Sequence, residues 1–291
     1  MSFQKFRILT DKIFFVFISV LSAIALIPFL LLIYDLLRKG FKQINADFIT
    51  MLPPTPTDAI LASAGGEMLP GGIVNGICGS FFLVLIATLL SVPLGILAGI
   101  FIHEKRKSKL SRIIQNATAI LYGTPSIIVG ICVYVMIVQP TRTFSAIAGG
   151  IALSITILPR IIRMTDETLK ILPEHLKESG LALGGSYSDV VLKIMIPAAK
   201  DGLLTGVLLS LSRSIGGTSP LILTAFGSSL INWDITMPTS SISLLIWKFI
   251  NIPNMADMLW SASLFLLTLV FSLNIIANRI GWRYKYIMFY E

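Results

Sequence analysis

Charge is scarce in this sequence: Asp, Glu, Lys and Arg make up 13% of the 291 residues, against 55% hydrophobic residues. A soluble domain normally carries about 25% charged residues, so this chain cannot cover itself with a hydrated surface. Cysteine is scarce as well. Cys78 and Cys132 both lie in apolar runs, where cysteine behaves as a small apolar residue, and they offer neither a disulfide framework nor a metal-ligand spacing. These deficits indicate an integral membrane protein.

The sequence also lacks a recognisable set of catalytic or metal-binding residues. The two histidines, His103 and His175, are expected in charged loops, and no nucleophile, paired carboxylate or metal cluster accompanies them in the sequence. We therefore expect no catalytic residue, no metal site and no cofactor in this chain, which argues against a membrane enzyme. The phosphate-binding loop G-x4-G-K-S/T is also absent from the sequence, so any ATP and Mg²⁺ would be bound by a separate chain.

The net charge of +8 does not indicate a nucleic-acid partner. The basic residues flank apolar runs, as they do at the surfaces of a bilayer, and they form no stripe with interleaved aromatic residues. We therefore expect membrane lipid, and no nucleic acid, around this chain.

Six apolar runs are long enough to be membrane spans, because about 20 residues of helix cross about 30 Å of hydrocarbon. The predicted spans are Ile13–Tyr34, Ile77–Ile102, Ile113–Val138, a fourth from Phe144 to Arg160, Leu203–Phe226 and Met258–Ala277. The segment from Thr239 to Ile252 is apolar but short, and we expect a half-buried outer loop or an interfacial helix there. The sequence thus predicts an all-α, polytopic fold with six transmembrane helices, five or seven being the alternatives.

The distribution of lysine and arginine predicts the orientation in the membrane. With a cytoplasmic N-terminus, inner segments carry 17 of the 23 basic residues, outer segments carry 5, and Arg213 lies within the membrane. The inner set includes Lys5, the cluster from Lys105 to Arg112, and Arg283 and Lys285. Because basic residues concentrate in cytoplasmic loops, we predict that both termini face the cytoplasm.

The outer segment from Asp35 to Gly76 is long and rich in proline and glycine. This composition predicts extended surface chain, either a linker or a docking surface for an external partner. We divide the chain into residues 1–74, an N-terminal span with this loop, and residues 75–291, the main transmembrane domain.

The cytoplasmic segment of about residues 166–200 is longer than a connector between spans needs to be. It contains a helical pattern up to Gly184, and Ser186 to Asp189 then resembles a weak capping box that would start a second short helix ending at Pro197. A hairpin of two helices with a glycine break can lie in a groove of another protein. The alternative is an ordinary solvated loop.

The spacing in this segment resembles a known pattern. Glu178-Ser179-Gly180, Gly184 and Ile194-Met195-Ile196-Pro197 match the EAA loop of ABC importer permeases, E-A-A-x3-G-x9-I-x-L-P, with small departures at Ser179, Gly180 and Ile196. The stretch from Arg213 to Leu221, R-S-I-G-G-T-S-P-L, resembles R-A-I-G-E-T-A-P-L of permeases in phosphate-specific transport systems. Similar stretches at Ser91–Ile96, Gly123–Gly130 and Arg163–Glu167 extend the resemblance over about residues 75–226.

The resemblance implies a type I ABC importer permease bundle in a bacterial cytoplasmic membrane. Its coupling loop would contact a separate ATPase through Glu178, Ser179, Gly180, Gly184, Ile194 and Pro197, with Gly184 as a hinge. The implied partners are a second permease subunit, two copies of the cytoplasmic ATPase and an external phosphate-binding protein.

Arg213 is the principal candidate for the substrate pathway. A charged side chain at mid-membrane costs about 2.5–3.5 kcal/mol, and a guanidinium suits a tetrahedral oxyanion. The other pathway candidates are Arg163, Thr218 and Ser219. Arg163 and Arg160, near the inner end of the fourth predicted span, could form a second basic station; flanking charge is the alternative for both and the favoured interpretation for Arg160. A structural ion pair is the alternative for Arg213.

The cargo and the transport class have alternatives as well. The family's glutamate is replaced by Gly217, which leaves sulfate or molybdate as alternatives to phosphate. An ATP-independent channel or carrier would be expected to have more ionisable residues in its spans.

Overall fold

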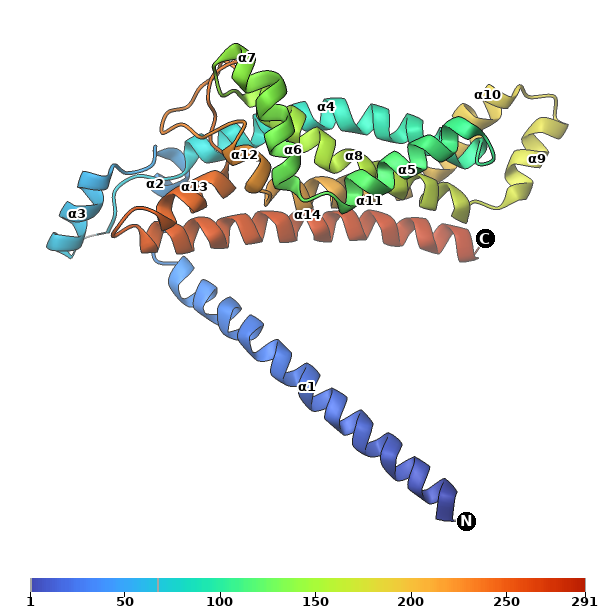
Figure 1. The fold of residues 1–291 in the computed structure, drawn as a ribbon, viewed down its shortest axis with the longest axis horizontal. Helices are drawn as coiled ribbons and strands as arrows, with labels where there is room; N and C mark the ends of the chain where they lie inside the picture. The colour runs from blue at the N-terminus through green and yellow to red at the C-terminus, as the bar shows by residue number, and fades with distance from the viewer. Residues whose placement is uncertain (1, 67, 291) are drawn as a thin grey trace.

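The computed structural model describes residues 2–66 and 68–290, which are mainly helical. The long helices are α1 (Ser2–Gly40), α4 (Val74–Glu104), α8 (Ala146–Ile171), α11 (Ile196–Ile215) and α14 (Ala256–Tyr290), as Figure 1 shows. The shorter ones are α2 (Ala46–Thr50), α3 (Pro56–Gly65), α5 (Lys109–Gly123), α6 (Ser126–Val133), α7 (Gln139–Thr141), α9 (Glu174–Ala182), α10 (Tyr187–Val190), α12 (Ser219–Ile222) and α13 (Ile242–Ile250), with π-helical turns η1 (Tyr134–Val138) and η2 (Val191–Met195). Within these ranges there is no strand, only an isolated bridge between Phe226 and Thr239.

The predicted all-α, polytopic fold is confirmed. Among the described residues, five helical stretches are long and apolar enough to cross a membrane, and the bent pair of α5 with α6 would make a sixth. Of the charges that predict cytoplasmic termini, the side chains of Lys5, Arg283 and Lys285 lie outside the described part of the structure.

The first span lies within α1, which stands away from the other helices in Figure 1. Its contacts with α14 lie near its C-terminal end, where a Cβ atom on Gly40 would be 2.7 Å from the Cβ of Leu264. The apolar part of α1 is exposed on all sides within the single chain. A helix that is apolar all round suits lipid or another membrane protein.

The third predicted span, Ile113–Val138, is wrong as a single helix. α5 ends at Gly123, and the chain bends by 104° before α6 begins. Thr124 between them has an extended backbone, with φ −76° and ψ 129°, because the ring of Pro125 disfavours a helical conformation in the residue before it. The apolar run is therefore divided between two helices.

The fifth predicted span, Leu203–Phe226, has the wrong limits. α11 ends at Ile215, before two glycines, and α12 is a separate turn. At its start, α11 continues α10 and η2, so one helical stretch covers residues 187–215.

The predicted helix end at Pro197 is also wrong. In η2 the N–H of Ile196 donates to the carbonyl of Val191, five residues earlier. This widened turn accommodates the ring and the missing N–H of Pro197, which would otherwise break an α-helix.

The outer segment is more ordered than the sequence predicts. Instead of extended surface chain, it forms α2 and α3, and Phe48 and Ile73 in it are fully buried. They pack in one apolar cluster with Leu245 and Phe249 of α13 and with residues of α14. The short apolar segment after Thr239 supplies α13 to this cluster, so burial of apolar side chains fixes a region that looks like a linker by composition.

The helices α4 and α8 approach closely at glycines. A Cβ atom on Gly95 would lie 2.6 Å from Cγ2 of Ile161, and one on Gly99 would lie 2.5 Å from the Cβ of Thr165. Small residues allow helix backbones to approach in membranes. This pair of helices is therefore a tightly packed unit of the bundle.

Replacing Gly99 with Ala is expected to destabilise the protein by roughly 1–3 kcal/mol, because the added methyl group overpacks the interface between α4 and α8. Gly123→Ala is the matched control, since a Cβ atom there has nothing within 4 Å. Alanine favours helix by about 1 kcal/mol over glycine, so the control should be neutral or stabilising. Thermal unfolding of the purified variants in detergent measures both, and equal midpoints would contradict the close packing.

Candidate functional site

A basic cleft of about 340 Å³ opens between α5, α8 and α11. Its lining residues are Tyr122 of α5, Arg160, Arg163, Met164 and Glu167 of α8, and Leu209, Ser210 and Arg213 of α11. Three guanidinium groups and one carboxylate line this cleft, so its net charge is positive. Such a cleft can hold an anion.

The three arginines have different partners. Arg163 donates from Nε to Oε1 of Glu167 at 2.8 Å and lies 5.7 Å from the ring centroid of Tyr122. Arg160 is half-buried, whereas Arg213 is exposed in the last turn of α11, where the helix dipole favours a positive charge. The Arg213 side chain forms no hydrogen bond or ion pair with the described residues. Its donors are thus free for a ligand.

The structure brings together two of the four predicted pathway residues. Arg213 and Arg163 line the cleft, while Thr218 and Ser219 do not and begin α12 instead. Close packing holds α12 against α6, because a Cβ atom on Gly130 would lie 2.9 Å from Cα of Pro220.

Arg160, for which flanking charge was the favoured interpretation, lines this cleft together with Arg163. It precedes Arg163 by three residues, a spacing that places two side chains on the same face of a helix. That spacing was the available signal.

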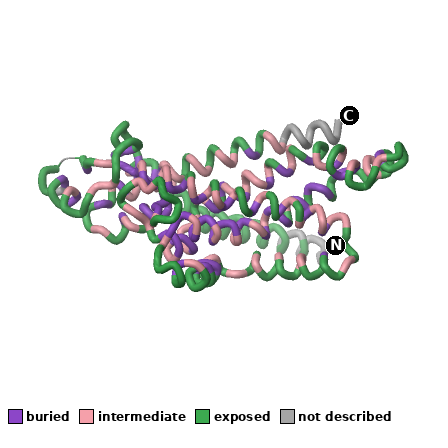
Figure 2. Tube along the Cα trace, turned by 90° about the horizontal axis from the view of Figure 1, so that it is seen from above, coloured by how far each residue is buried: buried purple, intermediate pink, exposed green. Residues whose placement is uncertain are grey.

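At one end of the bundle, α9 and α10 form a projecting hairpin, seen at the right of Figures 1 and 2. Asp166 to Ile171, the first residues of the predicted loop, belong to α8 instead. Between α9 and α10, Gly184 has φ +82° and donates to the carbonyl of Leu181, and Gly185 donates to that of Gly180. These two bonds form a Schellman motif, so the predicted hinge glycine occupies a defined turn.

The hairpin has a packed side and an uncovered side. Gly180 is buried, and a Cβ atom there would lie 2.8 Å from Cδ1 of Ile194. The side chains of Glu178, Ser179 and Pro197 are exposed. Leu183 is 89% exposed at the tip, which leaves an apolar surface free for another protein.

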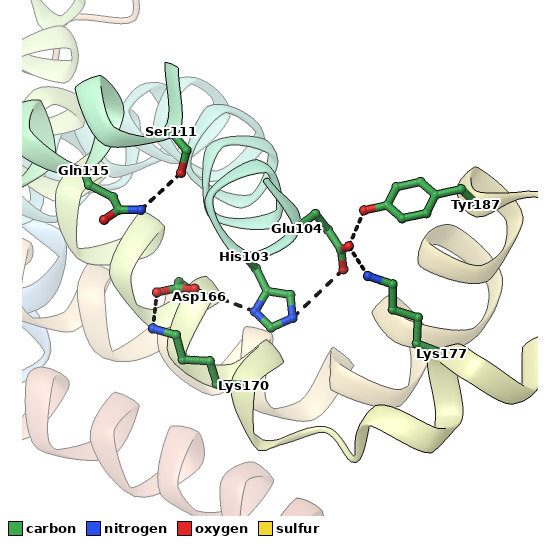
Figure 3. A network of polar contacts seen from close by, with 8 residues as sticks. All are labelled: His103, Glu104, Ser111, Gln115, Asp166, Lys170, Lys177 and Tyr187. Atoms are coloured by element: carbon green, nitrogen blue, oxygen red, sulfur yellow. Dashed lines mark hydrogen bonds and ion pairs between the residues drawn. The ribbon is translucent and has the colours of Figure 1, made fainter. Parts of the chain in front are cut away.

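Figure 3 shows a cluster of charged side chains where the hairpin meets the bundle. His103 lies in the last turn of α4 and not in a loop as predicted. Its Nδ1 is 3.7 Å from Oδ1 of Asp166, and its Nε2 is 4.0 Å from Oε1 of Glu104. Lys170 pairs with Asp166. In the described part of the chain, no three His, Cys, Asp or Glu side chains are placed to hold a metal ion.

Comparison with known proteins identifies the family. Residues 91–286 match the binding-protein-dependent transport system inner membrane component family. The phosphate transport system permease protein PstA of Haemophilus influenzae is 33% identical over 87% of this chain and 87% of its own length. The PstA protein of Yersinia pestis is 34% identical, over 88% of this chain and 84% of its own. A probable PstA of Methanocaldococcus jannaschii is 32% identical over 91% of each.

A solved structure shares the fold. The inward-facing MetNI methionine ABC transporter aligns with a TM-score of 0.59 and 18% identity, over 73% of this chain and 94% of that chain. The family match, the relatives and the helical bundle agree. The chain therefore belongs to the binding-protein-dependent inner membrane transport components and, within them, to the PstA family of ABC permeases.

Proposed function

We propose that this chain is a permease subunit of an ATP-driven importer of inorganic phosphate. The cleft with Arg160, Arg163 and Arg213 carries this proposal, because a positively charged cleft with unpaired guanidinium donors suits a phosphate ion. The names of the related PstA proteins support the same cargo. This chain would supply the path and no catalytic residue, with ATP and Mg²⁺ bound by a separate ATPase.

The exposed surfaces support a larger assembly. The hairpin with Leu183 at its tip would dock on the cytoplasmic ATPase, through the predicted coupling residues Glu178, Ser179, Gly180, Gly184, Ile194 and Pro197. The cleft and α1 are open in the single chain, and a second permease subunit would cover them. We infer a complex with a PstC-like permease, two PstB-like ATPases and an external PstS-like phosphate-binding protein.

The orientation follows from the same assignment. An ATPase bound to the hairpin places residues 174–195 on the cytoplasmic side of a bacterial inner membrane. The excess of basic residues in the inner segments supports cytoplasmic termini.

Sulfate or molybdate, the alternative cargo that Gly217 leaves open, is not favoured by the relatives, which are phosphate transport permeases by name. Glu167 also supports phosphate. It is the one carboxylate among the residues that line the basic cleft, and a carboxylate can accept a hydrogen bond from a protonated phosphate but not from the fully ionised sulfate dianion.

Uptake by the reconstituted complex tests the proposal. With ATP inside proteoliposomes oriented for import, we expect phosphate uptake at least about 10-fold above uptake without nucleotide, and above that of sulfate at equal concentration. A tenfold preference for phosphate over sulfate corresponds to a free-energy difference of about 1.4 kcal/mol. One charge-assisted hydrogen bond can supply more than this. Equal uptake with and without ATP would reject an ATP-driven permease, and preferred sulfate uptake would reject the cargo.

A further inference from the structure

One carboxylate contacts both arms of the hairpin. Glu104, the last residue of α4, accepts hydrogen bonds at Oε2 from Nζ of Lys177 on α9 and from the hydroxyl group of Tyr187 at the start of α10 (Figure 3). The ammonium group of Lys177 also lies 5.1 Å from the ring centroid of Tyr187, and that of Lys105 lies 5.7 Å from it. The two donors come from opposite sides of the turn at Gly184.

Glu104 is well shielded, and its surroundings are charged. Its side chain is 5% exposed, and Oε1 has no hydrogen-bond partner within the described residues. His103 lies between this oxygen and Asp166, whose own Oδ1 also has no hydrogen-bond partner among the described residues. A shielded carboxylate depends on its paired cation, because loss of one partner leaves an uncompensated charge. The contact with Lys177 should therefore persist while the hairpin moves.

The apolar contacts of the hairpin are mainly with its neighbours in sequence. The cluster under it contains Leu169 and Leu172 at the end of α8, Val190, Val191 and Met195, and Ala199 and Leu203 of α11. Ile100 is the residue that α4 contributes to this cluster. Glu104 therefore provides a polar connection from the hairpin to a helix that is distant in sequence.

The connection continues from α4 to the basic cleft. α4 is packed on α8 at Gly95 and Gly99, and α8 carries Arg160 and Arg163. Since close-packed helices move together more readily than they deform, displacement of α4 would displace these arginines as well.

We propose that Glu104 is a positioning residue for energy coupling: it holds both arms of the hairpin to α4, so that movement of the hairpin reaches α4, α8 and the arginine cleft. The inference rests on the proposed function, because it assigns a role in coupling ATP hydrolysis to transport. It does not require Glu104 to touch the ATPase or the substrate.

The test measures the number of phosphate ions taken up per ATP hydrolysed by the reconstituted complex. For Glu104→Ala we expect assembly with the ATPase within twofold of wild type, retained ATP hydrolysis, and at least a fivefold lower ratio. Glu104→Gln keeps an acceptor oxygen for Tyr187 but loses the charge, so its ratio should fall by only about half. Asp201→Asn is the matched control on α11, since the Asp201 side chain forms no hydrogen bond or ion pair with the described residues.

An unchanged ratio of phosphate taken up to ATP hydrolysed for Glu104→Ala would overturn the proposal. Reduced assembly with a normal ratio per assembled complex would also overturn it, because that result indicates a role in stability alone. If the Glu104→Ala complex does not assemble, Tyr187→Phe is tested instead, because this change removes only the hydrogen bond from the Tyr187 hydroxyl to Glu104. A wild-type ratio for the Tyr187→Phe complex would overturn the proposal too. Failure of the proposed function itself would be visible separately, as absence of ATP-dependent uptake by the wild-type complex.

Discussion

Replacing Arg213 with Gln is expected to lower ATP-dependent phosphate uptake by roughly 10- to 100-fold without preventing assembly. The reason is that Arg213 has no internal partner in the described structure, so its loss removes no ion pair of the fold. A hydrogen bond between charged groups contributes about 1.5–3 kcal/mol, and each 1.4 kcal/mol is about tenfold. Initial uptake rates in proteoliposomes, normalised to assembled complex, measure the effect.

Two further variants serve as comparisons for Arg213→Gln. Arg112→Gln removes an exposed arginine of α5 that does not line the cleft, and it should leave uptake unchanged. Arg163→Gln should have a smaller effect than Arg213→Gln, because Glu167 already engages the Arg163 guanidinium. Full uptake by an assembled Arg213→Gln complex would exclude this arginine from the substrate pathway.

Placing an aspartate at Gly184 is expected to reduce ATPase association at least fivefold. A Cβ atom at Gly184 has nothing within 4 Å, so the new side chain would point away from the hairpin and introduce a charge beside the exposed Leu183. The positive φ of this position adds a backbone cost of about 1–2 kcal/mol. Co-purification of the ATPase with the permease in detergent is the measurement, and Glu178→Lys, on the same hairpin, should also weaken association.

Gly66 offers a control with the same backbone strain. It follows α3, has φ +67°, and a Cβ atom there also has nothing within 4 Å. Gly66→Asp therefore adds an equal charge in a similar conformation at a site far from the hairpin in sequence. Equal ATPase recovery from the two aspartate variants would show that the hairpin tip is not the docking surface.

The sequence was informative where local composition decides structure. Apolar runs predicted the membrane-spanning helices, because a helix that crosses a bilayer needs a long apolar stretch. The spacing of the glycines predicted the hairpin. Hydropathy alone did not detect the bend at Pro125, since proline and its flanking residues are compatible with an apolar run. It also missed the folded outer segment, because the burial of Phe48 depends on α13 and α14, which lie about 200 residues later.

The site was only partly predictable for the same reason. Arg213 was conspicuous as a charge inside an apolar run, and Arg163 and Arg160 were conspicuous as basic residues near the inner end of the fourth predicted span. The partners of Glu104 are 73 and 83 residues away along the chain, so nothing near it in sequence indicates that they meet. Contacts of this kind follow from the three-dimensional path of the helices.

The π turn before Pro197 has a consequence for the arginine cleft. One helical stretch joins Tyr187 to Ile215, and an α-helix rotates by about 100° per residue. The additional residue accommodated in η2 therefore sets the angular phase between the hairpin and the face of α11 that bears Arg213. A chain one residue shorter in this turn could keep both motifs intact and still direct that guanidinium away from the cleft.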